Sequence, residues 1–271
     1  MAVDNAQILA DLDPDQLAVV TAIRGPVCVI AGAGTGKTRV ITNRIAYAIN
    51  AGVTDPTKVL ALTFTAKAAG EMRARLRVLG ISNAAARTFH SAALKQLLYF
   101  WPYAFGGQFP SLLTTKSGFI SQAITRAEVA IPAQVNALRE IASEIEWAKV
   151  LEISPEDYQE RAIESSRLVK LPNSKTQGEN LSMIAQVYEA YESLKKQERT
   201  LDFEDVLLLT VGMLEEDRGV RERVRDQYRY FTVDEYQDVS PLQQRLLNLW
   251  LGNREEICVV GDAAQTIYSF A

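Results

Sequence analysis

Short apolar runs alternate with helical patterns in the first ninety residues and again near the end of the chain. These runs have the length and apolar content of buried strands, and they occupy residues 27–30, 58–65, 86–90, 230–233 and 256–262. Most of them lead into segments in which apolar residues recur at helical spacing. Such alternation is typical of parallel sheets with right-handed crossovers. The pattern therefore predicts an α/β fold built on a parallel sheet.

The middle of the chain follows a different pattern. Between residues 91 and 200 no convincing strand run is present, and apolar positions recur at helical spacing, for example over 135–145 and 183–194. Turn-forming residues such as Gly, Pro and Asn separate these segments. The region is predicted to be an inserted α-helical subdomain, with residues 1–90 and 201–271 forming the two parts of the sheet domain.

Capping signals mark where several helices begin. Asp13 followed by Pro14 predicts an N-cap and a first helical residue. Asp202 stands before another apolar helical pattern and is predicted to cap it. A further helix is predicted over 241–251.

Composition narrows the class of protein. Of the 271 residues, 48% are hydrophobic and 23% charged, which predicts a soluble protein with a packed core. No apolar run reaches membrane-spanning length, and the N-terminus lacks the features of a secretory signal. Cys28 and Cys258 each lie in an apolar run without metal-ligand spacing, so buried thiols and a cytoplasmic location are expected.

The net charge of −4 argues mildly against a protein coated in nucleic acid, but it allows a local basic patch. The cations that lie around two of the strand ends are Lys67, Arg73, Arg75, Arg77 and Arg87. They are candidates for phosphate contacts, although such a run is often only a solvated helix face.

The stretch 27–38 carries the clearest chemistry. An apolar run enters a glycine-rich turn that ends in Gly36-Lys37-Thr38, and a helical pattern follows. Glycines let main-chain N–H groups approach an anion, and the helix N-terminus adds partial positive charge. Lys37 would bind the β- and γ-phosphates, and the Thr38 hydroxyl could ligate Mg²⁺. The first position of the strict motif holds Ala31 in place of glycine, so the match is to the relaxed form.

Two adjacent acids, Asp234 and Glu235, end the apolar run at 230–233. Carboxylates at the end of a buried strand are costly without a partner. In a nucleotide-binding α/β fold, the first acid would hold Mg²⁺ and the second would activate the attacking water. Capping of the following helix is the structural alternative. After the last strand run, Gln265 could hydrogen-bond a terminal phosphate, although loop glutamines are common.

Aromatic residues also gather near the predicted strand ends. Phe64, Phe89, Tyr268 and Phe270 are the aromatics, and His90, the only histidine, lies beside Phe89. Aromatic faces over a groove would stack unpaired bases. Each could equally be a core residue, and we expect this of Phe89. A metal site at His90 is not expected, because no second ligand lies at suitable spacing.

Taken together, the ordered motifs resemble the N-terminal half of superfamily 1 DNA helicases of the UvrD/Rep/PcrA group. The stretches that carry the resemblance are 12–16, 31–39, 62–69, 87–91, 202–205, 233–238 and 260–268. The combination with Asp234-Glu235-Tyr236-Gln237-Asp238 is highly specific. Residues 146–149 and the last motif look most like the actinobacterial second type of UvrD-like helicase.

The resemblance implies a fold and a set of roles. It implies a RecA-like P-loop domain, called 1A, with the helical insertion as domain 1B, and translocation on single-stranded DNA from three-prime to five-prime in repair or replication. Gln16 would read adenine and Arg39 would lie near the base. Glu235, Lys37 and Gln265 would be catalytic, and Thr38 with Asp234 would hold Mg²⁺. The nucleotide-binding set would be Gln16, Ala31, Gly32, Ala33, Gly34, Thr35, Gly36, Lys37, Thr38 and Arg39. The DNA-binding set, for a single strand or its junction with a duplex, would be Thr63, Phe64, His90, Tyr268 and Phe270.

Some positions depart from the family pattern. Ala66 stands where the family often has Asn, Ala264 where Asp is common, and Ser269 and Ala271 where basic residues are frequent. The resemblance also implies a second RecA-like domain with arginine fingers, and this chain stops near the last motif. We therefore expect a fragment that binds ATP and Mg²⁺ weakly and hydrolyses ATP slowly. A non-motor ATP- and DNA-binding module of a repair complex stays open as an alternative. A nucleotide kinase is disfavoured, because it has no need for the acid-rich motif.

Overall fold

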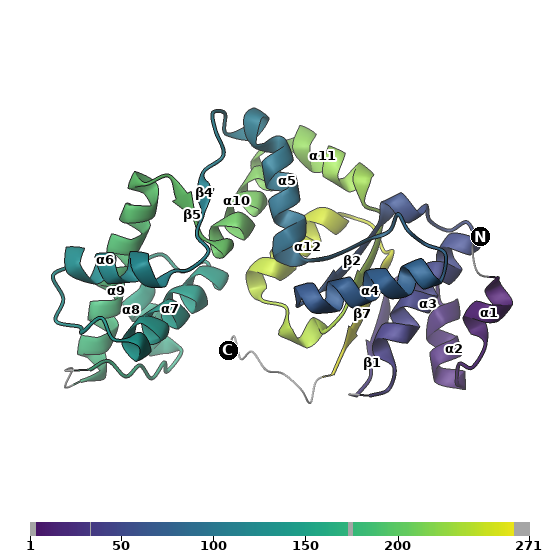
Figure 1. Ribbon diagram of the computed structural model, residues 1–271, viewed down its shortest axis with the longest axis horizontal. Helices are drawn as coiled ribbons and strands as arrows, with labels where there is room; N and C mark the ends of the chain where they lie inside the picture. The colour runs from purple at the N-terminus through teal and green to yellow at the C-terminus, as the bar shows by residue number, and fades with distance from the viewer. Residues whose placement is uncertain (1–3, 33, 173–175, 263–271) are drawn as a thin grey trace. The chain divides into compact units, whose positions relative to one another are not determined.

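A computed structural model describes residues 4–32, 34–172 and 176–262 (Figure 1). Two compact units make up the chain. Among the described residues, the first unit contains 4–104, 209–239 and 243–262, and the second contains 105–208 and 240–242. Helix α10, Phe203–Glu216, begins in the second unit and ends in the first.

A five-stranded parallel sheet forms the centre of the first unit, with strand order β1-β7-β6-β2-β3. The strands are β1 Val27–Ile30, β2 Val59–Thr63, β3 Ala85–Thr88, β6 Tyr230–Val233 and β7 Ile257–Gly261. Each described neighbouring pair is parallel, as in the register Thr232 to Cys258. All five carboxyl ends therefore meet at one edge, and the predicted parallel α/β fold is confirmed.

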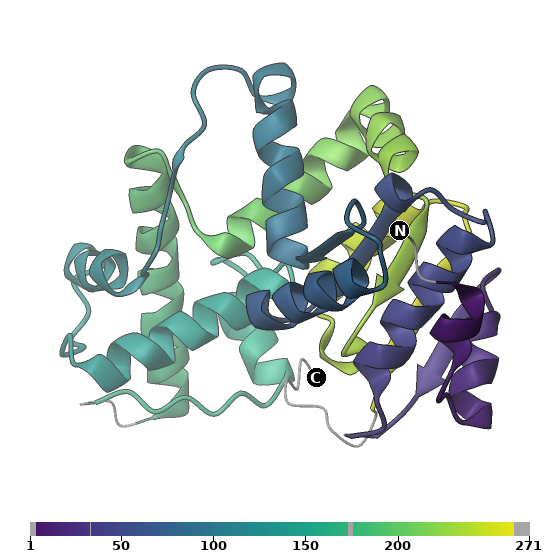
Figure 2. The ribbon, with the colours of Figure 1, turned by 45° about the vertical axis from the view of Figure 1, so that its right-hand side comes forward.

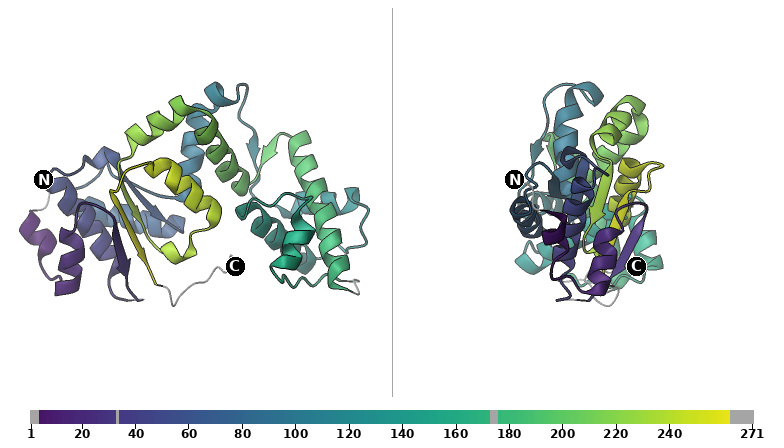
Figure 3. Two further views of the ribbon diagram at one scale, coloured as in Figure 1. Left: turned by 180° about the vertical axis from the view of Figure 1, so that it is seen from behind. Right: turned by 90° about the vertical axis from the view of Figure 1, so that its right-hand side faces the viewer.

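Helices cover both faces of this sheet (Figure 3). One layer contains α1 Asn5–Leu9, α2 Pro14–Thr21, α3 Lys37–Asn50 and α4 Ala66–Val78. Their apolar side chains, including Ile8, Ile41 and Met72, share a core with strand residues such as Ala61 and Val260. The short helices α1 and α2 pack beside α3 (Figure 2). This unit also contains α5 Phe89–Ala104, α11 Arg218–Gln227 and most of α12 Pro241–Leu251, with the 3-10 turns Pro56–Lys58 and Tyr236–Asp238.

Helix α5 belongs to the sheet unit, although its residues fall in the predicted insertion. The rings of Phe89 and Trp250 stack with centroids 6.0 Å apart, and Trp250 Nε1 donates to Gln96 Oε1 at 2.8 Å. These contacts hold α5 against α12 in the first unit. The two units therefore divide between residues 104 and 105 and between 208 and 209. The predicted boundaries lay between residues 90 and 91 and between 200 and 201.

The second unit is mainly helical. Its helices are α6 Ser117–Arg126, α7 Val135–Val150, α8 Tyr158–Glu164 and α9 Gln177–Gln197. Their buried faces form a separate core around residues such as Ile141, Ile184 and Tyr191. One detail of the prediction was wrong, because the short strands β4 Ser111–Leu112 and β5 Thr200–Leu201 pair in parallel. Strands of two residues are too short to produce a periodic pattern.

Two further expectations need correction. Phe89 and His90 begin α5 and do not end the preceding strand. Phe89 is buried, as expected for a core residue. Cys28 is exposed, whereas Cys258 is buried as predicted. Strand β1 lies at the sheet edge, and Val27 and Val29 are less exposed than Cys28 and Ile30.

Within the described residues, no helix is both long and apolar enough to span a bilayer.

Candidate functional site

The glycine-rich turn joins β1 to α3 and presents the first turn of that helix at the carboxyl edge of the sheet. Gly34 and Gly36 have φ values of 79° and 81°, a left-handed conformation that favours glycine. The Ala31 N–H donates to the Gly261 carbonyl at 3.0 Å, so the loop begins fixed to β7. Among the described residues, no side chain caps α3, and its first residues are Lys37 and Thr38. The loop has the geometry of an anion-binding helix N-terminus.

Lys37 meets one of the two predicted acids. Its Nζ atom lies 3.3 Å from Glu235 Oε2, and the Lys37 side chain is only 10% exposed. Glu235 has a φ of 52°, a left-handed conformation that costs a non-glycine residue roughly 1–3 kcal/mol and that clusters at functional sites. The phosphate-loop lysine and the acid after β6, 198 residues apart, thus share one site.

Asp234 lies beside this pair and is buried. Burial, together with the negative charge of Glu235, raises the pKa of Asp234 to about 6. The Glu235 N–H donates to Asp234 Oδ1 at 3.0 Å. A buried carboxylate whose ionised form is disfavoured suits a nearby cation, and carboxylate and hydroxyl oxygens are ligands that Mg²⁺ accepts. Asp234 and Thr38, the predicted metal ligands, therefore fit such an ion by their chemistry.

Gln16 joins the helix α2 to the glycine-rich loop. Its Nε2 donates to the Thr35 carbonyl at 3.1 Å, and its Oε1 accepts from Arg39 Nη2 at 2.7 Å. Asp13 caps α2 as predicted, because its Oδ1 accepts from the Gln16 N–H at 2.8 Å. The structure therefore brings together two residues, Gln16 and Arg39, that the family resemblance placed at the nucleotide base.

A cavity of about 570 Å³ opens between α2, β1 and the loop. Its lining includes Gln16, Cys28, Thr35, Lys37 and the apolar Val260. A concave surface with an apolar floor and a few convergent polar groups is the usual form of a small-molecule site. The predicted nucleotide residues Ala31 and Gly32 also line it.

Gln237 is a residue of this site to which the sequence assigned no role. Its Nε2 donates to Glu235 Oε2 at 2.8 Å and to Asp238 Oδ2 at 3.2 Å. Its Oε1 accepts from the Asp262 N–H at 3.0 Å, so it connects the ends of β6 and β7. A Cβ on Gly261 would lie 2.7 Å from Gln237 Oε1, so a larger residue there would displace this amide. Its place in the motif after Glu235 was the available signal, but no spacing rule shows where an amide will bond.

The predicted DNA contacts lie at the neighbouring strand ends. Phe64 follows β2 and His90 is in the first turn of α5, and both are half-buried. Thr63 is 2% exposed, and its hydroxyl donates to the Thr65 carbonyl at 3.1 Å. Thr63 thus supports the turn in this structure and does not present its hydroxyl to solvent. The other predicted residues Ala33, Gln265, Tyr268 and Phe270 lie outside the described residues.

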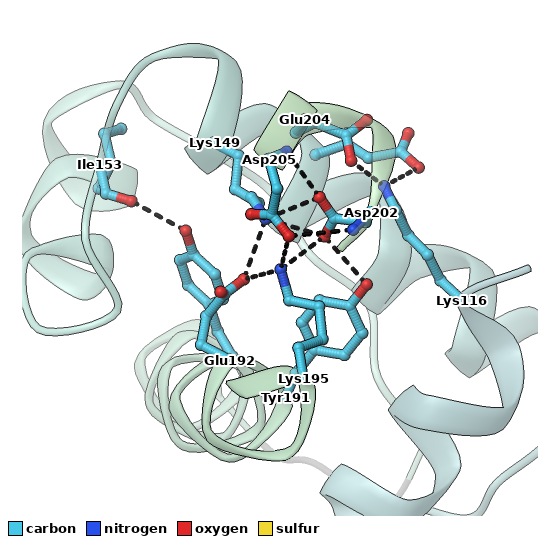
Figure 4. Close-up of polar contacts among 11 residues, drawn as sticks. Lys116, Lys149, Ile153, Tyr191, Glu192, Lys195, Asp202, Glu204 and Asp205 are labelled. Atoms are coloured by element: carbon cyan, nitrogen blue, oxygen red, sulfur yellow. Dashed lines mark hydrogen bonds and ion pairs between the residues drawn. The ribbon is translucent and has the colours of Figure 1, made fainter. Parts of the chain in front are cut away.

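A second polar cluster lies in the helical unit (Figure 4). Lys149 on α7 and Lys195 on α9 both bind Asp202, at 2.8 Å and 2.9 Å, and both contact Glu192 and Asp205. Three carboxylates so close together could hold a metal ion. Here the two buried ammonium groups already supply the positive charge, so the cluster is structural. Asp202 also caps α10 as predicted, accepting from the Asp205 N–H at 2.9 Å.

Comparison with known proteins identifies the family of the chain. A family model described as the UvrD/REP helicase N-terminal domain matches residues 12–271. The chain therefore belongs to the UvrD/REP helicase family.

Three relatives represent the similarity. The ATP-dependent DNA helicase UvrD2 of Mycobacterium tuberculosis is 45% identical over 281 aligned residues, which include 100% of this chain and 39% of that protein. The helicase PcrA of Leuconostoc citreum is 32% identical over 94% of this chain and 33% of its own length. The helicase Rep of Buchnera aphidicola is 33% identical over 94% and 36%. The chain thus spans between a third and two fifths of the length of these relatives, and the expected likeness to the actinobacterial type is confirmed.

Proposed function

We propose that this chain is the ATP-binding and single-stranded-DNA-binding half of an ATP-dependent DNA helicase that translocates three-prime to five-prime in repair or replication. The first unit would be domain 1A and the second domain 1B. One observation carries the proposal: Lys37, which begins α3, lies 3.3 Å from Glu235 at the end of β6. The helicase relatives support the DNA substrate, which would place the protein at the nucleoid in the cytoplasm.

The residues of the site then divide the work. The loop amides and Lys37 hold the β- and γ-phosphates, and Gln16 with Arg39 holds the base. Asp234 and Thr38 would hold Mg²⁺, which neutralises phosphate charge during transfer. Glu235 accepts the proton of the attacking water. Gln237 orients the Glu235 carboxylate through the 2.8 Å hydrogen bond from its Nε2 to Glu235 Oε2. The Lys37 ammonium forms an ion pair with Glu235, and a triphosphate would compete for that ammonium.

Catalysis by this chain alone is expected to be slow. An arginine finger is worth roughly 10³–10⁵ in rate, and the family resemblance assigns such arginines to a second RecA-like domain. The non-motor alternative, an ATP- and DNA-binding module of a repair complex, uses the same residues. The two differ in whether binding of DNA accelerates ATP turnover in the longer protein.

Binding of a fluorescent ATP analogue tests the core of the proposal. The chain should bind it with Mg²⁺, and Lys37→Ala should weaken binding at least tenfold, because a charge-assisted phosphate contact is lost. Lys196→Ala, an exposed cation on α9, is the matched control and should leave binding unchanged. Equal binding by Lys37→Ala and the parent would contradict the assignment. Vigorous DNA-stimulated ATP turnover by this chain would contradict the expectation that catalysis by this chain alone is slow.

A further inference from the structure

A groove runs beside the edge strand β3 in the first unit, and its charged residues are all basic. A cavity of about 510 Å³ is lined by Arg73 of α4, Arg87 of β3 and Lys95 of α5, and its described lining contains no Asp or Glu. Ser91, Asn83 and Gln227 add hydroxyl and amide groups. In a chain with a net charge of −4, three cations from three elements around one cavity indicate an anionic ligand.

In the described part of the chain, no carboxylate pairs with these cations. Within the described residues, no ion pair involves Arg73, Arg87 or Lys95, whereas many other cations pair with an acid, such as Lys116 with Glu204 at 2.6 Å. The Nε atom of Arg87 is buried without a hydrogen-bond partner in the described part of the chain. Arg73 uses one guanidinium nitrogen for the Ala86 carbonyl and is otherwise exposed.

A second cavity, of about 780 Å³, continues the groove between α5 and α11. The two cavities share Lys95, Gln227 and Tyr228, and the second adds Arg223 and Tyr99. Tyr99 is 69% exposed. The acids on α11 are engaged elsewhere, because Glu222 pairs with Arg225 and Asp226 with Arg229. Cations next to an exposed aromatic face are the pattern of a single-stranded nucleic acid site.

The edge of β3 does not favour an added peptide strand. Arg73 Nη1 donates to the Ala86 carbonyl at 2.6 Å, and Ser91 Oγ accepts from the Thr88 N–H at 3.0 Å. These side chains occupy main-chain groups that strand addition would use. The groove also begins at Thr88 and Ser91, next to His90 at the carboxyl edge of the sheet.

We propose that this groove, defined by Arg73, Arg87, Lys95, Arg223 and Tyr99, binds the backbone phosphates of a single DNA strand as it leaves the carboxyl ends of β2 and β3. It extends the DNA site of the proposed function and rests on that function. Lys95 and Arg223 supply phosphate contacts, and Tyr99 offers a ring for one base.

Fluorescence anisotropy with an oligothymidylate of about 20 nucleotides tests the proposal, because this length exceeds a single-domain site. The variant Lys95→Gln/Arg223→Gln should bind about tenfold more weakly, and the slope of log K against log salt should fall by about 1.4, for two lost contacts. The control Arg24→Gln/Arg218→Gln removes the same charge from exposed positions of the same unit that do not line the groove. It should stay within about twofold of the parent.

Each other result overturns the proposal in a distinct way. Equal losses in the two double variants would mean attraction by total charge only. No loss in Lys95→Gln/Arg223→Gln would exclude the groove while DNA binding by the chain stands. If the parent chain binds no DNA, the proposed function fails together with the groove. Binding of poly-glutamate that Lys95→Gln/Arg223→Gln abolishes, with DNA affinity unchanged, would assign the groove to an acidic protein. Circular dichroism of both variants checks that they fold.

Discussion

Both carboxylate oxygens of Asp202 lie 2.8 Å from the Nζ atom of Lys149, and both side chains are buried. Lys195 and the Tyr191 hydroxyl bind the same carboxylate. Asp202, which directly precedes α10, therefore connects that helix to α7 and α9. Breaking a buried ion pair on one side leaves an uncompensated charge. Replacing one member of this cluster should therefore destabilise the helical unit.

Removal of Lys149 is the direct test. Lys149→Met should lower the free energy of unfolding by about 3–5 kcal/mol, because Asp202 loses a buried partner. Urea unfolding followed by circular dichroism measures the change. Arg161→Gln, which removes one member of an exposed ion pair on α8, should leave the midpoint unchanged. A small effect of Lys149→Met would show that Lys195 alone suffices for Asp202.

Acid should weaken the same cluster. Burial alone would raise the pKa of Asp202, but the Lys149 and Lys195 ammonium groups outweigh it and hold this pKa well below its usual range. A lowered folded pKa contributes stability above the unfolded value of about 4, and that stability is lost as pH falls below it. The free energy of unfolding should therefore drop between pH 5 and pH 3. Asp202→Asn, although less stable at pH 7, should show a smaller drop.

Asp234 should show the opposite sign. Its folded pKa is raised to about 6 by burial and by Glu235, so the folded state favours the protonated form. Stability then falls as pH rises from about 4 to 6 and stays lower above. Asp234→Asn should raise the free energy of unfolding at pH 8 by about 1–3 kcal/mol and should bring no gain at pH 4. The same variant should lose Mg²⁺-dependent nucleotide binding. Destabilisation at pH 8 would contradict the role of burial.

Gln237 and Gly261 should behave as a coupled pair. A methyl group at Gly261 would lie 2.7 Å from Gln237 Oε1 and would displace the amide from the Asp262 N–H. Gly261→Ala should cost about 1 kcal/mol of stability, the value of one hydrogen bond. In a Gln237→Ala background the added cost should be smaller, because that bond is already absent. Additive effects in this double-mutant cycle would show that the two residues act independently.

The two cysteines should differ in reactivity. Cys28 is exposed and lines the cavity next to Gln16 and Lys37, whereas Cys258 is buried and burial raises its pKa. A thiol reagent such as DTNB should modify one thiol quickly and the second only on unfolding. An ATP analogue with Mg²⁺ should slow the first reaction by covering Cys28. Unchanged labelling with bound nucleotide would place the ligand outside this cavity.

Local rules predicted much of this protein. The parallel strands, the glycine-rich turn before α3 and the N-caps Asp13 and Asp202 follow from patterns within a few residues. The exposure of Cys28 did not follow, because an apolar strand reads the same at the edge of a sheet as in its centre. The place of α5 was missed for a related reason, since its contact with Trp250 joins residues more than 150 positions apart.

The sequence by itself determined the chemistry at each position of the proposed nucleotide site: a glycine-rich turn, a lysine at the start of a helix and two acids after a strand. Only the tertiary structure decided which groups meet, since the parallel sheet brings Glu235 to Lys37 and the end of β7 to Gln237. It also decided that Lys149 and Lys195, ordinary helix residues in the sequence, are buried around one carboxylate. Such pairings depend on burial and on distance in space, which no local pattern specifies.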